Sequence, residues 1–468
     1  MADVQPVDLI PILEKGLLAD QANLTKWDAY YEGNQPLKYM SEAMREEIAS
    51  KVGDTVAELV FNWARVVADA YETRLDIEGF RYADADSGDK DLWAAWQYNQ
   101  MDEQSQQGHL DSIVLSRSYV TVGANTESDM PPLVSVESPF QMWAQRDART
   151  RKVSAALKQW TDLDDVAHSL VYTPNTTAEF IKGKNGWEPN GPADNHNFGV
   201  VAVVPLVNRP RIRRPDGMTE LADIIPVADA CNKMATDLMV SAEYHAMPRR
   251  WAFGLKQSDF VDPAGNPIPV WSQMQTRIWA NENKDVNVGQ FQESDLANFH
   301  NSIKLLAQVA AMMAALPPHY MQFAGSNPAS ADAIKSSETQ LVKRVERKHT
   351  YLGGAWEDVQ RLNMMFTRGS SELQPRDYTL ETVWRDPSTP TVAQKADAAV
   401  KLYQAGAIPL EQTRIDLGYS DTQRKQMALM DAAAVENTPA ARFARSSDGL
   451  GTSIDAAVTT VEPTDATA

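Results

Sequence analysis

Apolar residues recur at intervals of three and four along much of the chain, the spacing that places them on one face of an α-helix. Near the N-terminus this spacing predicts helices over residues 59–75 and 91–107, and we interpret the first 120 residues as mainly helical. The spacing resumes at Thr219 and predicts a helix over residues 219–246. Pro226 either kinks that helix or lies in its first turn.

A second strongly apolar helix is predicted over residues 294–316. One of its stripes contains Leu296, Phe299, Ile303, Leu306, Ala310 and Met313, and another contains Leu305, Val309, Met312 and Leu316. The third face is polar or carries small residues. We therefore expect a helix that is packed on two flanks and exposed on one side.

A very long helix should follow, with Asn327 as its N-cap, Pro328 at its first position and its end near Arg368. At 1.5 Å per residue its length would be about 60 Å. A strand is predicted at residues 377–386, then three short helices over residues 391–434. The remaining residues are rich in Ala, Thr, Ser and Asp, and we expect them to be disordered.

The pattern between the N-terminal helices and Thr219 is different, because apolar and polar residues alternate or form short β-branched runs. Strands are predicted at residues 118–124, 132–138 and 153–160, and a hairpin at residues 177–189. We interpret Tyr119 to about Val207 as a mainly β insertion on a helical base. The predicted fold class is therefore α+β.

Two connecting segments carry large side chains. The segment 247–283 contains four prolines and five aromatic residues and predicts a small module of loops, strands and one helix. The second segment, AALPPHYMQFAGSNPASADAI, starts at Ala314, and its two prolines end the preceding helix. The large side chains of this loop raise the question of what they contact.

Composition bounds the possible functions. The chain has 468 residues, so two or more domains are expected, and its net charge of −19 argues against a basic nucleic-acid-binding surface. The single cysteine, Cys231, excludes an intrachain disulfide and favours a reducing compartment. We expect no signal peptide at the N-terminus, and the most apolar run, residues 305–316, is too short to span a membrane.

Motifs for catalysis or metal binding are weak. The sequence has no GxxxxGK[ST] phosphate loop, and none of its seven histidines forms a pair at i, i+4. The acidic stretch around Asp84, Asp86 and Asp89 lacks the glycine and the terminal glutamate of a calcium loop. We therefore expect no catalytic residue, no metal and no cofactor, and we predict that the protein is not an enzyme.

Two basic features leave alternatives open. The helices over residues 394–427 could be taken for a helix-turn-helix DNA-binding motif. Because they lack a basic stripe, a packing role is favoured. The cluster RPRIRRPDG, residues 209–217, is densely basic. In so acidic a chain it is expected to meet a neighbouring subunit or another partner, with DNA phosphate as the alternative.

Four long segments taken together carry a family resemblance: residues 62–81 (NWARVVADAYETRLDIEGFR), 203–212 (VVPLVNRPRI), 217–254 and 315–348. Over about residues 25–435 the chain resembles the portal proteins of tailed bacteriophages, especially long-tailed phages of actinobacterial hosts. The resemblance implies a portal fold with a helical and β wing, a two-helix stem, a small clip, a long wing helix and a helical crown.

The resemblance also implies a division of the chain. The expected parts are an N-terminal segment 1–24, a wing with its β insertion 25–218, a stem helix 219–246, a clip 247–288, a second stem helix 289–316, a tunnel loop 317–331, the long helix and wing return 332–390, a crown 391–434 and a disordered tail 435–468.

By the same resemblance, the protein would form a ring of about twelve subunits at one capsid vertex, assembled in the host cytoplasm. Double-stranded DNA would pass through the ring during packaging and ejection. The expected partners are the terminase large subunit, the head–tail adaptor, and the major capsid and scaffolding proteins, without a membrane. A non-channel head adaptor or scaffold is the main alternative, and an enzyme with an unrecognised carboxylate site is another.

Site residues follow from this assignment. The DNA-channel loop would present Tyr320, Met321, Gln322, Phe323, Gly325 and Asn327. Stem contacts between subunits would involve Leu296, Phe299, Ile303, Leu306 and Met313. Partner docking at the clip would involve Arg249, Arg250, Trp251 and Trp271. In the alternative, the aromatic loop folds back as a hydrophobic plug on the stem.

Simple geometry permits a conduit. About twelve helices packed side by side at roughly 10 Å spacing enclose a bore of about 28 Å once the thickness of the helices is subtracted. That bore is wider than a DNA duplex of about 20 Å. The acidic composition further leads us to expect a negatively charged lining, which would let the duplex slide without adsorbing.

Overall fold

The protein is described by a computed structural model that contains both helices and sheets, in agreement with the predicted α+β class. The described residues are 5–36, 38–39, 42, 46, 60–85, 87–125, 127, 130–246, 250–253, 287–290, 296–321, 331–388, 392–419 and 421–436. The chain divides into two compact units, residues 1–388 and 389–468.

Helices form the centre of the first unit: α1 (Pro6–Glu32), α3 (Trp63–Glu72), α4 (Lys90–Tyr98), α5 (Met101–Leu115) and the long α9 (Ala331–Arg368). Their shared core contains a cluster of aromatic side chains, in which Trp356 of α9 is fully buried with its ring 5.0 Å from that of Trp96. The predicted end of the long helix at Arg368 is confirmed. The proposed N-cap, Asn327, lies outside the described residues.

The predicted helix over residues 91–107 is two helices. The chain breaks at Gln100, whose φ of 53° is left-handed. The cause is a tertiary contact, because the Asn99 amide donates both to the Ala95 carbonyl and to the Pro132 carbonyl of a distant loop, at 2.9 and 3.0 Å.

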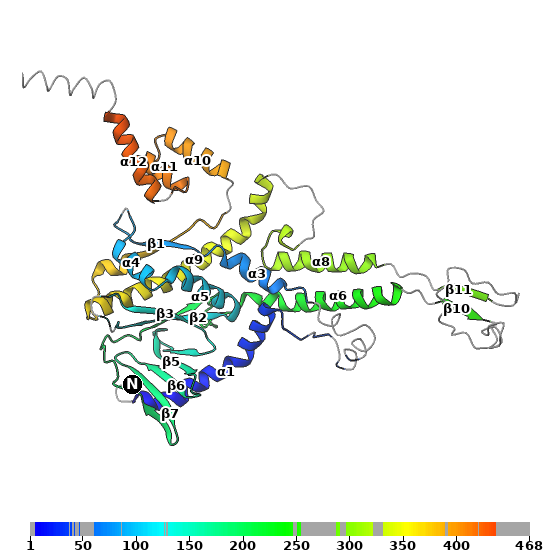
Figure 1. Cartoon of the computed structure of the whole chain (residues 1–468), viewed down its shortest axis with the longest axis horizontal. Helices are drawn as coiled ribbons and strands as arrows, with labels where there is room; N and C mark the ends of the chain where they lie inside the picture. The colour runs from blue at the N-terminus through cyan, green and yellow to red at the C-terminus, as the bar shows by residue number, and fades with distance from the viewer. Residues whose placement is uncertain are drawn as a thin grey trace, which may run out of the picture. The chain divides into compact units, whose positions relative to one another are not determined.

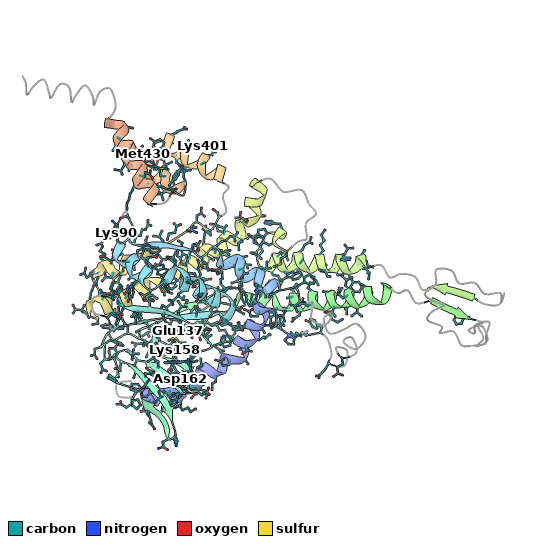
Figure 2. All side chains as sticks on the ribbon, in the orientation of Figure 1. Lys90, Glu137, Lys158, Asp162, Lys401 and Met430 are labelled. Carbon is teal, nitrogen blue, oxygen red and sulfur yellow. The ribbon has the colours of Figure 1, made fainter. Side chains whose placement is uncertain are left out.

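The β insertion is confirmed and forms two antiparallel sheets. One is β3 (Leu133–Glu137), β2 (Arg117–Gly123) and β9 (Val203–Val207), in that order, and the other is the meander β4 (Met142–Arg146), β5 (Val153–Thr161), β6 (Ala167–Tyr172), β7 (Thr177–Gly183) and β8 (Gly186–Pro189). The predicted hairpin is β7–β8, with Gly183 opposite Gly186. The Lys158 ammonium in β5 lies 2.6 Å from the Glu137 carboxylate in β3, so an ion pair joins the two sheets (Figure 2).

A further two-stranded sheet was not predicted in full. The expected strand at residues 377–386 is β12 (Leu380–Trp384), preceded by a short 3₁₀ helix, η5 (Pro375–Thr379). Its partner is β1 (Ile77–Tyr82), which lies in the region predicted to be mainly helical. The pairing joins segments about 300 residues apart, with Phe80 opposite Thr382.

Two helices, α6 (Ile225–Ala246) and α8 (Ala297–Met313), run side by side and antiparallel (Figure 1). A short 3₁₀ helix, η2 (Glu220–Asp223), precedes α6, and Pro226 lies in the first turn of α6 rather than at a kink. Both helices carry small buried side chains: Ala228, Cys231 and Ala235 on α6, and Ala307, Ala310 and Ala311 on α8. Between the two helices in sequence, β10 (Arg250–Phe253) pairs with β11 (Asn287–Gln290).

The second unit contains the three predicted short helices, α10 (Val392–Gln404), α11 (Leu410–Asp416) and α12 (Asp421–Glu436). Left-handed glycines, Gly406 and Gly418, follow the first two helices and allow the chain to turn. Among the described residues of this unit only Ala399 and Thr413 are buried, while Met430 is 60% exposed (Figure 2). Residues 437–468 lie outside the described part of the chain.

Candidate functional site at the base of the paired helices

The C-terminal end of α8 is held by side chains from two other helices. The Tyr71 hydroxyl of α3 donates to the Ala314 carbonyl at 2.6 Å, and the Arg344 guanidinium of α9 donates to the Met313 carbonyl at 3.1 Å. The last carbonyls of a helix have no partner within the helix, so these two bonds satisfy groups that would otherwise be unpaired. They fix the end of α8 to the helical core of the unit.

The chain then turns sharply. Ala315 adopts a left-handed φ of 55°, and the Leu316 amide donates back to the Ala311 carbonyl at 2.8 Å. This arrangement closes the helix in the manner usually reserved for glycine. Pro317 and the 3₁₀ helix η4 (Pro318–Tyr320) follow, so the predicted helix end is confirmed.

The first two residues predicted to contact DNA in the channel pack against their own subunit. The Arg74 guanidinium donates to the Tyr320 hydroxyl at 2.8 Å, and Met321 is only 6% exposed. The Tyr320 hydroxyl and the Met321 side chain are therefore held against their own subunit, as in the hydrophobic-plug alternative. The other four residues of the predicted loop, Gln322, Phe323, Gly325 and Asn327, lie outside the described residues.

A buried ion pair lies beside this turn. The Lys348 ammonium of α9 is 2.7 Å from the Glu220 carboxylate of η2, and the two side chains are 2% and 3% exposed. Asn208 donates to Glu220 at 3.3 Å and accepts a hydrogen bond from Lys348, whose ammonium also lies 4.8 Å from the centre of the Tyr71 ring. The start of α6 and the end of α8 are thereby joined to α9 by one polar network.

The electrostatics of the pair follow from its burial. Burial lowers the pKa of Lys348, and the neighbouring Glu220 opposes that effect. Burial also acts to raise the pKa of Glu220, but Lys348 and Arg209 outweigh it and hold that pKa below its usual range. Removing either partner alone would leave a buried charge uncompensated, which is strongly destabilising.

The five predicted stem-contact residues do not share one exposed face. Ile303 is only 8% exposed and packs inside its own subunit, while Leu296, Phe299 and Leu306 are half-buried. Met313 alone of the five is clearly exposed, at 40%. The larger exposed apolar surface belongs to the second predicted stripe, where Leu305 is 60% and Met312 is 71% exposed. The packing against α6 explains the difference, because it turns the first stripe toward the interior of the subunit and leaves the second stripe exposed.

The expected negative lining finds little support in these helices. The sequence of α6 contains Asp229, Asp237, Glu243 and Lys233, and that of α8 contains Lys304. Three acidic and two basic side chains leave a net charge of −1 on the pair. Lys233 is also ion-paired with Asp237. The acidic excess of the chain therefore lies mainly outside α6 and α8.

Of the predicted docking residues, Arg250 and Trp251 belong to β10, opposite Gln290 and Gly289 of β11. Arg249 and Trp271 lie outside the described residues. The docking assignment therefore stays a prediction.

In the described part of the chain, no three His, Cys, Asp or Glu residues gather as metal ligands. Burial raises the pKa of Cys231 to about 12, so this thiol is a poor nucleophile. In the acidic stretch, Asp84 lies 3.3 Å from Arg376 and Asp89 caps α4. Within the same described residues, no helix is long and apolar enough to cross a membrane.

Comparison with known proteins identifies the family. The family model described as phage portal protein, SPP1 Gp6-like, matches residues 12–438. The portal protein of Mycobacterium phage D29 is 36% identical over 422 residues, covering 86% of each chain. The portal protein of Mycobacterium phage L5 is 35% identical over 408 residues, covering 84% of this chain and 83% of the relative.

A chain in a solved structure of the neck of a native GTA particle, computed with C12 symmetry, is 12% identical with a TM-score of 0.43. It covers 85% of this chain and 99% of its own length. That likeness is too weak to support an inference. The match to the family model and the two curated relatives show that the chain belongs to the SPP1 Gp6-like family of phage portal proteins.

Proposed function

We propose that the protein forms a ring of about twelve subunits at one capsid vertex and that double-stranded DNA passes through this ring during packaging and ejection. The observation that carries the proposal is membership in the portal family over residues 12–438. Portal proteins are structural components of tailed phages, and we assign this protein a structural, non-catalytic role. A head adaptor or scaffold without a channel is the alternative.

The paired helices α6 and α8 support assembly into a ring. Met239 on α6 and Leu305 and Met312 on α8 are between 41% and 71% exposed in the single subunit. Large apolar side chains exposed on two adjacent helices are typical of a surface that another protein covers. A neighbouring copy is the natural occupant, because a ring repeats one head-to-tail contact until it closes.

The low charge of the same helices suits a conduit. Proteins that hold DNA tightly neutralise several phosphates with lysine and arginine. Here Lys304 and the ion-paired Lys233 are the only lysines or arginines in the sequences of α6 and α8. A duplex inside a bore lined by these helices would be held weakly and could slide. The driving force must come from a separate motor, for which the terminase is the proposed partner.

The proposed docking sites for partner proteins are those predicted from the sequence. We propose that the terminase large subunit and the head–tail adaptor dock on the clip through Arg249, Arg250, Trp251 and Trp271, and that the capsid and scaffolding proteins surround the wing. Gln322, Phe323, Gly325 and Asn327 are the proposed channel contacts. Tyr320 and Met321 have a different role in this scheme, since they anchor the start of the loop to the core.

Deletion of residues 322–325 tests the channel role. Because Tyr320 and Met321 keep their contacts, the ring should assemble normally, while the amount of DNA packaged or retained in the capsid should fall. Packaged DNA is measured by nuclease protection, and ring assembly is measured in parallel as particle mass. The matched control replaces the same four residues with Gly and Ser, which preserves the loop length. Normal packaging by the deletion variant would refute the role of these residues.

A further inference from the structure

Two turns at opposite ends of the five-stranded sheet carry charges of opposite sign. β5 is nine residues long, so its ends lie about 30 Å apart. At its C-terminal end the turn to β6 has the sequence Asp162-Leu163-Asp164-Asp165, and at its N-terminal end the turn from β4 contains Arg149, Arg151 and Lys152. Figure 2 shows Lys158 within the sheet and Asp162 at its acidic end.

The acidic turn is a rigid projection with an apolar tip. The Asp162 carboxylate accepts the backbone N–H groups of Asp164 and Val166 at 2.9 Å each, and its other oxygen lies 3.0 Å from His168. Leu163 is as exposed as in an extended peptide, at 104%. Asp164 and Asp165 are exposed and form no ion pair with any described residue. The turn therefore presents one uncovered leucine among carboxylates.

The basic end contains a cleft between β4 and the loop 209–216. Its apolar lining includes Trp143, Pro210, Ile212 and Pro215, and its charged lining consists of Arg146, Arg151 and Arg211 together with Asp147 and Asp216. Reciprocal backbone hydrogen bonds between Arg211 and Arg214, at 3.0 and 2.9 Å, hold the loop in a tight turn. Ile212 at its tip is 88% exposed.

The charge at this end is opposite in sign to that of the whole chain. Residues 146–152 and 211–216 contain seven basic side chains and two acidic ones, a net charge of +5. The chain as a whole has a net charge of −19. Asp147 caps its own turn by accepting the Thr150 N–H at 2.7 Å, and Asp216 lies 3.6 Å from Arg146. Within the structure described, Arg149, Arg151 and Arg211 have no carboxylate within ion-pair distance, so they are available to a partner.

We propose that the Asp162–Asp165 turn of one subunit docks into the arginine-rimmed cleft of the next subunit, an inference that rests on the proposed ring. Leu163 packs against the apolar lining residues Trp143 and Ile212, while Asp164 and Asp165 face Arg151 and Arg211. The two surfaces differ and lie at opposite ends of one sheet, so the contact is head-to-tail and repeats in one direction around a ring. The leucine supplies affinity, and the charges fix the orientation.

DNA is a less suitable occupant of the cleft. A phosphodiester would match the arginines, but it would leave the apolar lining of the cleft and the exposed Leu163 without a counterpart. Exposed ion pairs contribute little by themselves, so a site for a second copy needs the apolar contact that is present here. DNA binding is therefore an outcome of the test rather than part of the proposal.

Two charge-reversal variants provide the test. The tip variant, Asp164→Lys with Asp165→Lys, changes the acidic turn from −3 to +1, and the cleft variant, Arg149→Glu, Arg151→Glu and Arg211→Glu, changes the basic end from +5 to −1. Each variant alone places like charges opposite each other in the proposed contact. Ring assembly is measured by mass photometry, and we expect the protein concentration for half-maximal assembly to rise about tenfold or more. The effect should shrink in 1 M salt, where the screening length is about 3 Å.

Mixing the two variants gives the decisive result. In an alternating ring, the tip variant's lysines meet the cleft variant's glutamates, while every other contact is native. Equimolar mixing should restore assembly close to the wild-type concentration. The matched controls preserve charge: Asp164→Glu with Asp165→Glu, and the three arginines replaced by lysine. Leu163→Ser, at a fully exposed position, tests the apolar part without a risk to folding and should also weaken assembly.

The outcomes separate the hypotheses. Rings formed by both variants at wild-type concentrations would overturn the docking contact while leaving the portal function intact. Failure of the mixture to restore rings from folded variants would overturn it as well. Unchanged rings with weaker binding of a duplex DNA probe would assign the cleft to DNA instead. A wild-type protein that never forms rings would overturn the proposed function itself.

Discussion

A single buried residue, His109, makes the stability of the fold depend on pH. It is fully buried on α5, and its Nε2 accepts the indole N–H of Trp356 at 2.8 Å. Burial lowers the pKa of His109 to about 3. The unfolded chain therefore binds a proton below its ordinary pKa of about 6.5 that the folded chain does not bind, and stability falls as the pH decreases from about 6.5 toward 3.

We expect His109→Gln to remove this dependence. The glutamine oxygen can still accept the Trp356 N–H, but it takes up no proton. Between about pH 7 and pH 5, the wild-type free energy of unfolding should fall by about 2 kcal/mol more than that of the variant. Burial also lowers the pKa values of His196 and His349, and both proteins retain those residues, so denaturant titrations at the two pH values isolate His109. Equal changes in the two proteins would contradict the assignment.

At the scale of the element, one face of α8 packs inside its own subunit, and the exposed face is the proposed contact with a neighbouring subunit. Met312→Asp should leave the free energy of unfolding of the subunit nearly unchanged, because this side chain is 71% exposed. The variant should nevertheless reduce ring yield, since a charge would enter the contact between subunits. Ile303→Asp, at a position that is 8% exposed, should instead destabilise the subunit by about 3 kcal/mol or more.

Unfolding titrations at low protein concentration, together with particle mass at high concentration, separate these two effects. Met312→Ala is the matched control, since it shortens the side chain without adding charge. If Met312→Asp assembles as readily as the wild-type protein, the exposed stripe of α8 is not a subunit contact.

Local elements could be predicted from the sequence, while their partners could not. The β7–β8 hairpin and the three C-terminal helices depend on turn residues close in sequence, and both predictions are confirmed. β1 was missed because its partner strand is about 300 residues away, and the break at Gln100 depends on the hydrogen bond from Asn99 to the Pro132 carbonyl. Similarly, the two stripes of α8 were visible, but only its packing on α6 shows that Ile303 faces inward.

At the candidate site, too, the contacts between distant residues could not be predicted from the sequence. The resemblance drew attention to the chain around Tyr320, yet the direction of that side chain is set by Arg74, more than 200 residues earlier. The Glu220–Lys348 pair had no local signal either, because its members are 128 residues apart and each is an ordinary charged residue of a helix. Such long-range polar contacts come from the topology and not from any short pattern.

At the scale of the whole molecule, the central claim is that many copies close around a hole wide enough for DNA. Electron microscopy of the purified, full-length protein tests this claim most directly. We expect closed rings with a mass near twelve times the 51.9 kDa subunit and a central opening wider than about 20 Å. Single subunits under all conditions that favour assembly, or rings with an opening too narrow for a duplex, would contradict it.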